Sequence, residues 1–176
     1  MVGPLTFDCR LPVIAAASLV LAGGCQPSTS DWPRVTPSVP APDFTLPTLD
    51  GGTVTLADQR GRVVIMEFWA TWCPPCRYST PSLEAIHRRY RNRGVTVLLI
   101  NAGESVERIK AWAERRFTAP ILLDEEGQVA QLYQVSGVPQ LFVVDQDGQI
   151  VYDRSGYRGG LEHNLKVILN ELLGEG

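Results

Sequence analysis

Two cysteines, Cys73 and Cys76, are separated by only two prolines and are the residues best suited to redox or metal chemistry. An apolar run at residues 63–68 leads into them, and a helix-like segment at 79–93 follows, so the pair lies where a strand ends and a helix begins. The first turn of a helix offers unpaired N–H groups and the positive end of the helix dipole. A thiolate there is stabilised and is a better nucleophile near neutral pH. The spacing also lets the two sulfurs close a disulfide and exchange electrons with another protein through a mixed disulfide.

A cysteine pair of this spacing can also be half of a zinc site. A tetrahedral zinc ion needs four ligands, and the sequence has no second C-x-x-C and no H-x-x-x-H. Its two histidines, His87 and His163, are far apart in the chain. A strand before the pair and a helix after it favour redox work, so we expect no metal at this site.

The elements that position the pair follow from apolar periodicity and turn residues. The almost unbroken apolar run at 63–69 is typical of a central strand covered on both faces, and residues 95–101 form a second such strand. A right-handed crossover through the helix at 79–93, kinked or restarted at Pro81, makes these strands parallel. The other expected elements are a hairpin at 44–46 and 53–56, a helix at 105–117, a strand at 121–123, a helix at 127–133, a hairpin at 141–145 and 150–153, and a helix at 160–173.

Several motifs together resemble the thioredoxin superfamily. The segments WCPPC at 72–76 and GVP at 137–139 are similar to its active-site and cis-proline loops. The opening APDFTL at 41–46 and the segment NAGES at 101–105 resemble its TlpA/ResA-like branch, which acts in the bacterial cell envelope. The resemblance covers about residues 41–173. It implies a thioredoxin-like α/β domain over residues 43–174, with a mixed sheet, helices on both faces and an N-terminal β-hairpin extension.

The resemblance also assigns roles to individual residues. Cys73, near the surface, is expected to attack, and Cys76, one turn inward, to resolve the mixed disulfide. The Val138–Pro139 bond is expected to be cis rather than an ordinary trans turn, and the Val138 backbone to pair with a substrate strand. Trp69 is expected to pack in the core. The residues expected to contact substrate are Trp72, Pro74, Pro75, Glu104, Val138 and Pro139.

Glu104 follows a strand at the sheet edge where open α/β folds place ligands, so it is expected to shape the substrate groove. The alternative is a solvated loop acid. Pro74 and Pro75 lack N–H groups, so the Cys73 thiolate must rely on later donors, including the N–H of Cys76. We therefore predict a weakly stabilised thiolate and a reductant; a potential near about −120 mV, the oxidising end of the scale, would contradict this.

Glu67 interrupts the central apolar run, where a carboxylate is costly unless it is paired or protonated. Its spacing from Cys73 resembles that of the buried acid of thioredoxins. Many TlpA/ResA-like proteins instead carry a glutamate three residues after the second cysteine, where this chain has Ser79. We expect Glu67 to have a raised pKa and to act as the base for Cys76. The alternative is that Glu67 points to an open edge or pairs with a lysine or arginine.

Residues 1–24 resemble a secretory leader of the lipoprotein type. The apolar stretch at 11–22 is shorter than the roughly 20 residues that span a membrane. It ends in LAGGC, which resembles a lipoprotein signal box, so Cys25 is expected to be lipidated. A plain cleaved signal and an uncleaved anchor are the alternatives, and all three export the domain. The proline-rich residues 25–42 are expected to be a linker that holds the domain off the membrane, with no role for Trp32.

The length of 176 residues allows one domain plus an extension, and a net charge of −3 gives no electrostatic support for nucleic-acid binding. The resemblance implies a membrane-tethered, extracytoplasmic thiol–disulfide oxidoreductase on the periplasmic side. It would reduce disulfides of envelope proteins such as apocytochrome c during cytochrome c maturation, take electrons from a membrane thiol reductase, and need no soluble cofactor.

Two other functions are open. One is a peroxiredoxin-like peroxidase, although its P-x-x-x-T-x-x-C pattern is absent around Cys73. The other is a non-catalytic module that binds haem proteins or copper.

Overall fold

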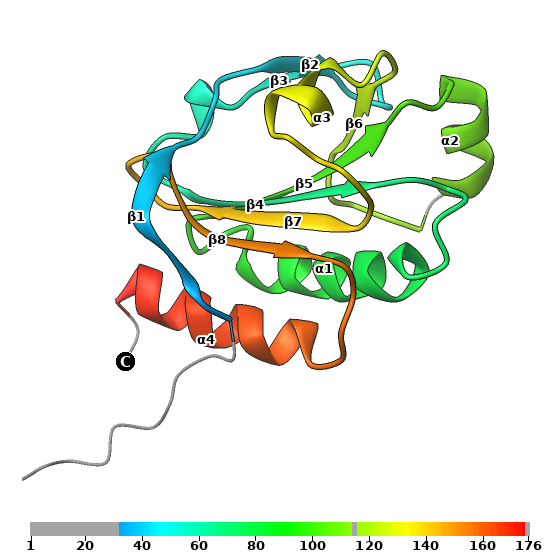
Figure 1. The fold of residues 1–176 in the computed structure, drawn as a ribbon. Coiled ribbons are helices and arrows are strands. Elements are labelled where there is room, and N and C mark those ends of the chain that lie inside the picture. The colour runs from blue at the N-terminus through cyan, green and yellow to red at the C-terminus, as the bar shows by residue number, and fades with distance from the viewer. Residues whose placement is uncertain (1–31, 114–115, 175–176) are drawn as a thin grey trace, which may run out of the picture.

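The computed structural model describes residues 32–113 and 116–174 (Figure 1). The expected leader, the lipidation site Cys25 and the start of the linker lie outside these residues. The described chain forms a mixed sheet with strand order β1-β8-β7-β4-β5-β6. Its strands are β1 (Arg34–Pro40), β4 (Val63–Trp69), β5 (Val95–Ala102), β6 (Ile121–Asp124), β7 (Gln140–Val144) and β8 (Gln149–Ser155).

The central strands β4, β5 and β6 are parallel, as the crossover argument predicts for the first two. Strands β7, β8 and β1 add antiparallel neighbours on the other side of β4. The expected N-terminal hairpin forms a separate two-stranded sheet of β2 (Thr45–Pro47) and β3 (Thr53–Thr55). The helices are α1 (Cys76–Tyr90), α2 (Val106–Ala113), α3 (Gln128–Leu132) and α4 (Leu161–Leu173), with a 3-10 turn at Ala57–Gln59. Helix α1 begins at Cys76, earlier than expected, and runs through Pro81.

Both faces of the sheet are covered, which is why β4 is apolar almost throughout. Ile65 and Trp69 point into a cluster formed with residues of α1, α2 and α4. Met66 and Phe68 point the other way, into a cluster formed with the hairpin and α3. Figure 1 shows α1 and α4 on one face of the sheet, and α3 with β2 and β3 on the other. This mixed sheet with helices on both faces is the expected fold class.

Residues 34–40 fell within the expected linker but form the edge strand β1, antiparallel to β8. An edge strand accepts Pro37 and Pro40 because only one of its sides must supply hydrogen bonds to a neighbour. Just before it, Trp32 is 5% exposed within the core cluster of α1 and α4. The Arg154 guanidinium lies 4.7 Å from the centre of the Trp32 ring. This segment therefore packs as part of the domain, and Trp32 is a core residue.

Candidate active site

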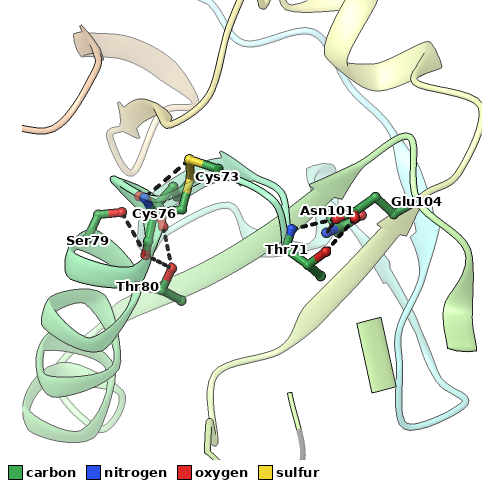
Figure 2. The surroundings of a disulfide bond; sticks show 8 residues. Thr71, Cys73, Cys76, Ser79, Thr80, Asn101 and Glu104 are labelled. Carbon is green, nitrogen blue, oxygen red and sulfur yellow. Dashed lines mark hydrogen bonds between the residues drawn. A yellow bond between two sulfur atoms is a disulfide. The ribbon is translucent and has the colours of Figure 1, made fainter. Parts of the chain in front are cut away.

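Cys73 and Cys76 form a disulfide at the junction of β4 and α1, with their Cα atoms 5.4 Å apart (Figure 2). Cys76 is the first residue of α1, so the pair lies at the helix N-terminus as expected. The backbone N–H of Cys76 donates to Cys73 Sγ at 3.2 Å. Pro74 and Pro75 between them have no N–H to offer. In the disulfide form the N–H of Cys76 is thus directed at Cys73 Sγ, and the reliance of the Cys73 thiolate on this donor stays a prediction.

The expectation that Cys73 lies near the surface is wrong. Cys73 is 1% exposed and Cys76 is fully buried, because both pack into the core cluster that contains Trp69. The surface at this point is formed by Trp72, which is 64% exposed, and by the two exposed prolines. A partner therefore meets an aromatic ring and proline rings before it meets the sulfur.

The loop between α3 and β7 brings the second motif to the same region. The Val138–Pro139 peptide bond is cis, as expected. The half-buried Val138 side chain packs against the core cluster that holds the cysteines. Pro139 itself is buried, and its carbonyl accepts a hydrogen bond from Gly156 N at 2.8 Å. Pairing of the Val138 backbone with a substrate strand stays a prediction.

Glu67 lies in the middle of the sheet and not at an edge. On β4 it is paired with Leu99 of β5 and Leu141 of β7, and it is 1% exposed. No lysine or arginine among residues 32–113 and 116–174 forms an ion pair with it. The alternative of an open edge is therefore wrong, and the described part of the chain offers no basic partner. Burial raises the pKa of Glu67 to about 8, although hydrogen bonds from Ser79 and Thr80 oppose the rise.

A threonine hydroxyl lies between the Glu67 carboxylate and the backbone carbonyl of the resolving cysteine. Thr80 Oγ1 lies 3.4 Å from Glu67 Oε2 and 2.6 Å from the carbonyl oxygen of Cys76. A hydroxyl carries one hydrogen, so Thr80 can donate to only one of these acceptors at a time. When Glu67 is protonated, Thr80 donates to the nearer Cys76 carbonyl and can accept the hydrogen of Glu67. When Glu67 is ionised, Thr80 can donate to its carboxylate, which is how Thr80 opposes the rise of the Glu67 pKa. Sequence reasoning missed Thr80, whose only signal is its position one turn after Cys76.

Glu104 is not a solvated loop acid. It is 6% exposed, and its carboxylate accepts hydrogen bonds from Thr71 N and Thr71 Oγ1, both at 2.6 Å, and from Asn101 Nδ2 at 2.9 Å (Figure 2). Arg108 lies 3.8 Å away. Burial raises the pKa of Glu104, but the hydrogen bonds from Asn101 and Thr71 outweigh burial and hold the pKa below its ordinary value. The carboxylate therefore fixes the loop that leads to Cys73.

The aromatic residues close to the cysteine pair in sequence are of two kinds, buried and exposed. Trp69 is fully buried with its ring centre 4.5 Å from that of Trp112, which agrees with its expected packing role. Tyr78, which sequence reasoning missed, is 65% exposed and stacks on Tyr157 with ring centres 5.9 Å apart. Tyr78 and Trp72 are thus exposed aromatic residues on either side of the cysteine pair in sequence.

The described residues contain neither a cluster of metal-binding side chains nor a membrane-spanning helix. Within the described part of the chain, no group of three or more His, Cys, Asp or Glu side chains is placed to hold a metal ion. None of the helices in residues 32–113 and 116–174 has the length and apolar character needed to cross a bilayer.

Comparison with known proteins gives consistent matches. The profile of the AhpC/TSA family matches residues 37–153. The thiol-disulfide oxidoreductase ResA of Geobacillus kaustophilus is 38% identical over 111 residues, which are 62% of this chain and 64% of that relative's length. ResA of Bacillus thuringiensis subsp. konkukian is 30% identical over 131 residues, 73% of this chain and 76% of the relative.

A solved structure of a related protein is consistent with the similarity to the ResA proteins. The crystal structure from Chlorobium tepidum described as a thiol:disulfide interchange protein DsbE has 33% sequence identity and a TM-score of 0.72, covering 78% of this chain and 97% of that one. The family match spans most of the described domain, including both cysteines and the cis-proline loop. This chain therefore belongs to the AhpC/TSA family and has the thioredoxin-like fold of its ResA and DsbE relatives.

Proposed function

We propose that this protein is a thiol–disulfide oxidoreductase that reduces disulfides of partner proteins. The observation that carries the proposal is the Cys73–Cys76 disulfide at the N-terminus of α1, with the Cys76 N–H directed at Cys73 Sγ. In the reduced protein that N–H and the helix dipole stabilise a thiolate on Cys73. The names of the ResA and DsbE relatives support the same chemistry.

The reaction proceeds in two exchanges. The Cys73 thiolate attacks one sulfur of the partner's disulfide, and the partner's other sulfur leaves as a thiolate. Cys76 then attacks Cys73 Sγ, which forms the Cys73–Cys76 disulfide and releases the partner as a dithiol, so two electrons pass to the partner. The Cys76 thiol must lose its proton for this step. Glu67, whose pKa is raised to about 8, is suited to accept that proton, and Thr80 lies between its carboxylate and the backbone carbonyl of Cys76.

The proposal extends to the direction of electron flow, the protein substrate and the cellular location. Pro74 and Pro75 limit the donors to the Cys73 thiolate, which favours a reductant. The leader-like residues 1–24 and the signal box at Cys25 support a lipid-anchored protein on the periplasmic side of the membrane, with a membrane thiol reductase as its electron donor. The similarity to ResA and DsbE supports envelope proteins, with apocytochrome c among them, as substrates. Trp72, Pro74, Pro75, Val138 and Pro139 would contact the substrate.

Partner trapping tests this function. In Cys76→Ala the mixed disulfide on Cys73 cannot be resolved, so partners remain covalently attached and can be identified from the native envelope. The control is Cys73→Ala with Cys76→Ala, which should trap nothing. An apocytochrome with C-x-x-C-H, or its dedicated chaperone, would establish the maturation role. A spread of unrelated envelope proteins would mean a general reductant, and the cytochrome assignment would be dropped.

Membrane tethering has its own test. If Cys25 carries the lipid, Cys25→Ala should move the protein out of the membrane fraction. A variant that stays in the membrane fraction like the wild type would contradict the lipid anchor and favour an uncleaved anchor.

The AhpC/TSA match favours one second candidate, a peroxidase. Against it stands the sequence around the active-site pair, where Ala70 and Met66 occupy the places of the threonine and proline of the P-x-x-x-T-x-x-C pattern. Failure to consume hydrogen peroxide with a dithiol as electron donor would exclude this activity.

A further inference from the structure

Helices α1 and α2 and the segment before β6 line a groove of about 690 Å³. Three arginines line it, Arg77 and Arg88 from α1 and Arg116 from the segment after α2. Trp112 and Phe117 line its apolar part. We call this feature the arginine groove. Its combination of guanidinium groups and aromatic rings makes it a candidate binding surface.

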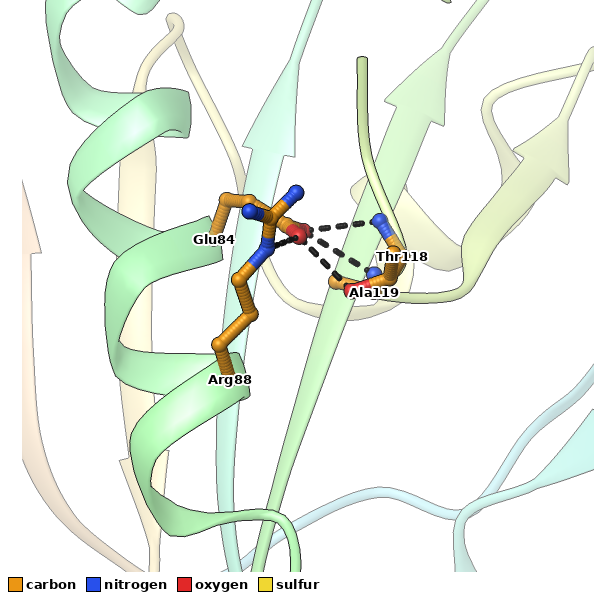
Figure 3. Close-up of polar contacts among 4 residues, drawn as sticks. All are labelled: Glu84, Arg88, Thr118 and Ala119. Carbon is orange, nitrogen blue, oxygen red and sulfur yellow. Dashed lines mark hydrogen bonds and ion pairs between the residues drawn. The ribbon is translucent and has the colours of Figure 1, made fainter. Parts of the chain in front are cut away.

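The single carboxylate that lines the arginine groove in the described part of the chain does not neutralise all three arginines. Among the described lining residues the only carboxylate is Glu84, which is 6% exposed. It accepts hydrogen bonds from Arg88 Nε at 2.6 Å, Thr118 N at 2.9 Å and Ala119 N at 3.0 Å (Figure 3). In the described part of the chain, Arg77 and Arg116 form no ion pair. Glu84 offsets Arg88, and the charges of Arg77 and Arg116 remain available for a ligand.

The aromatic part of the groove supplies an apolar contact. The rings of Trp112 and Phe117 stack with centres 5.2 Å apart and an interplanar angle of 12°. The Arg116 guanidinium lies 5.9 Å from the centre of the Trp112 ring. Arginine binds carboxylates through paired hydrogen bonds and also packs on aromatic faces. The chemistry that fits is a carboxylate next to an apolar side chain, which is the chemistry of an acidic polypeptide segment.

The position of the groove connects it to the redox centre. Arg77 directly follows Cys76 in the first turn of α1. At about 1.5 Å per helical residue, Arg77 and Arg88 lie about 16 Å apart along the helix axis, the length of roughly five extended residues. The Cα atoms of Cys73 and Cys76 are 5.4 Å apart, and Arg77 is the residue after Cys76. A polypeptide joined to Cys73 through a mixed disulfide therefore has its flanking residues within reach of Arg77 and of the groove that Arg77 lines.

We propose that the arginine groove binds an acidic segment, with at least one apolar side chain, that flanks the disulfide of the partner polypeptide. This inference rests on the proposed thiol–disulfide exchange and adds a selection rule for its substrates. The whole chain has a net charge of −3, so attraction to an acidic segment is local to the groove. Charge complementarity of this kind sets the docking register, the choice of partner and the association rate more than it sets raw affinity.

Two synthetic peptides test the inference. Both contain one intramolecular C-x-x-C disulfide; in one it is followed by Asp-Phe-Glu-Leu, and in the other by the uncharged Asn-Phe-Gln-Leu. The full chain is reduced, freed of reductant and mixed with each peptide, and the second-order rate constant of a single turnover is measured. At low salt we expect the acidic peptide to react about five- to tenfold faster, because two partly exposed charge pairs, one with Arg77 and one with Arg116, contribute to its binding. Salt should reduce this preference.

Charge-reversal variants locate the effect. Arg77→Glu and Arg116→Glu should abolish the preference for the acidic peptide. Arg89→Glu is the matched control, because Arg89 follows Arg88 on the same helix, is exposed and does not line the groove. It should keep the preference. The ratio of the two rate constants is compared, so a change in the reactivity of Cys73 that affects both peptides cancels.

The outcomes separate this inference from the proposed function. Equal rate constants for the two peptides with the wild type would overturn the inference and leave the proposed exchange intact. An equal loss of preference in Arg89→Glu would also overturn it, since the effect would then belong to the general charge of α1. Binding to anionic lipid vesicles that depends on Arg77 and Arg116, without any peptide preference, would reassign the groove to lipid headgroups. Reduction of neither peptide would contradict the proposed function and this inference with it.

Discussion

Glu104 accepts two hydrogen bonds from Thr71, one from the backbone nitrogen and one from Oγ1, each 2.6 Å long. Glu104 follows strand β5, and Thr71 precedes Cys73 by two residues. A single buried carboxylate therefore joins the end of one central strand to the loop that presents the attacking cysteine. The Glu104 carboxylate therefore positions this loop, because its hydrogen bonds to Thr71 form within the protein and do not require a bound substrate.

Removal of this carboxylate should destabilise the protein and slow the exchange. Glu104→Ala leaves Thr71 N and Asn101 Nδ2 without their acceptor, and we expect a loss of about 2–4 kcal/mol in the free energy of unfolding, measured with urea. The exposed Glu107→Ala should change it by no more than about 0.5 kcal/mol. Thiol exchange by Glu104→Ala should be slower than in the wild type under conditions where both are folded.

The pH dependence of this effect follows from the lowered pKa of Glu104. The stabilisation is present above the ordinary glutamate pKa of 4.5 and is lost as pH falls through the lowered pKa in the folded state. The difference between wild type and Glu104→Ala should thus shrink in acid. A difference that grows below pH 4.5 would contradict the ionised state of Glu104.

Glu67 should have the opposite pH dependence. Its pKa is raised from 4.5 to about 8 in the folded protein, so between these values the unfolded chain binds fewer protons than the native one. Stability therefore falls as pH rises. Across this window the wild type should lose on the order of 5 kcal/mol relative to Glu67→Gln. Denaturant unfolding of the disulfide forms near the two ends of the window measures this, and parallel curves would contradict the raised pKa.

The proposed catalytic role of Glu67 predicts a change in rate as well. The wild-type rate of disulfide exchange should show an inflection near the Glu67 pKa of about 8, and Glu67→Gln should lack it. Thr80→Val should move this inflection upward, because the charged carboxylate loses a donor, and Thr80→Ser should restore it. If Glu67→Gln left the pH profile unchanged, its role as the base for Cys76 would be excluded.

Glu84 should be a second stabilising carboxylate. It ties α1 to the segment before β6 by accepting hydrogen bonds from Thr118 N, Thr118 Oγ1 and Ala119 N. Glu84→Ala should lower the free energy of unfolding by about 2–4 kcal/mol, because these donors are left without an acceptor. Glu162→Ala, which removes a half-exposed ion pair with Lys166, should cost less than about 1 kcal/mol. Similar losses for the two variants would contradict the structural role of Glu84.

Two tryptophans should respond differently to the same substitution. Trp32 is 5% exposed, so Trp32→Ala should cost about 3–5 kcal/mol in the free energy of unfolding. Trp72 is 64% exposed, and Trp72→Ala should change stability by no more than about 0.5 kcal/mol. Guanidinium unfolding of the disulfide forms compares them directly. A small effect at Trp32 would mean that the segment before β1 does not contribute to the core.

Much of the fold and the centre of the site were predictable because they depend on local signals. The apolar run of β4, the periodicity of α1 and the turn residues of the hairpins are patterns within short stretches of chain. The position of Cys73 and Cys76 between β4 and α1 follows from them. The cis conformation of Pro139 came from the resemblance of the GVP loop, since the residues alone favour the trans form.

The remaining features depend on partners far away in the chain, which only the tertiary structure brings together. Residues 34–40 are rich in proline and lack an apolar period, yet they pair with β8, more than a hundred residues later. Glu104 is an ordinary loop acid in sequence until Thr71 supplies its donors. Sequence alone thus determined the order of the helices and strands that follow β1, together with the redox pair, because these follow from local residue types. Tertiary packing decided the burial of Cys73, the ionised state of Glu104 and the arginine groove, because each depends on desolvation and contacts between distant segments.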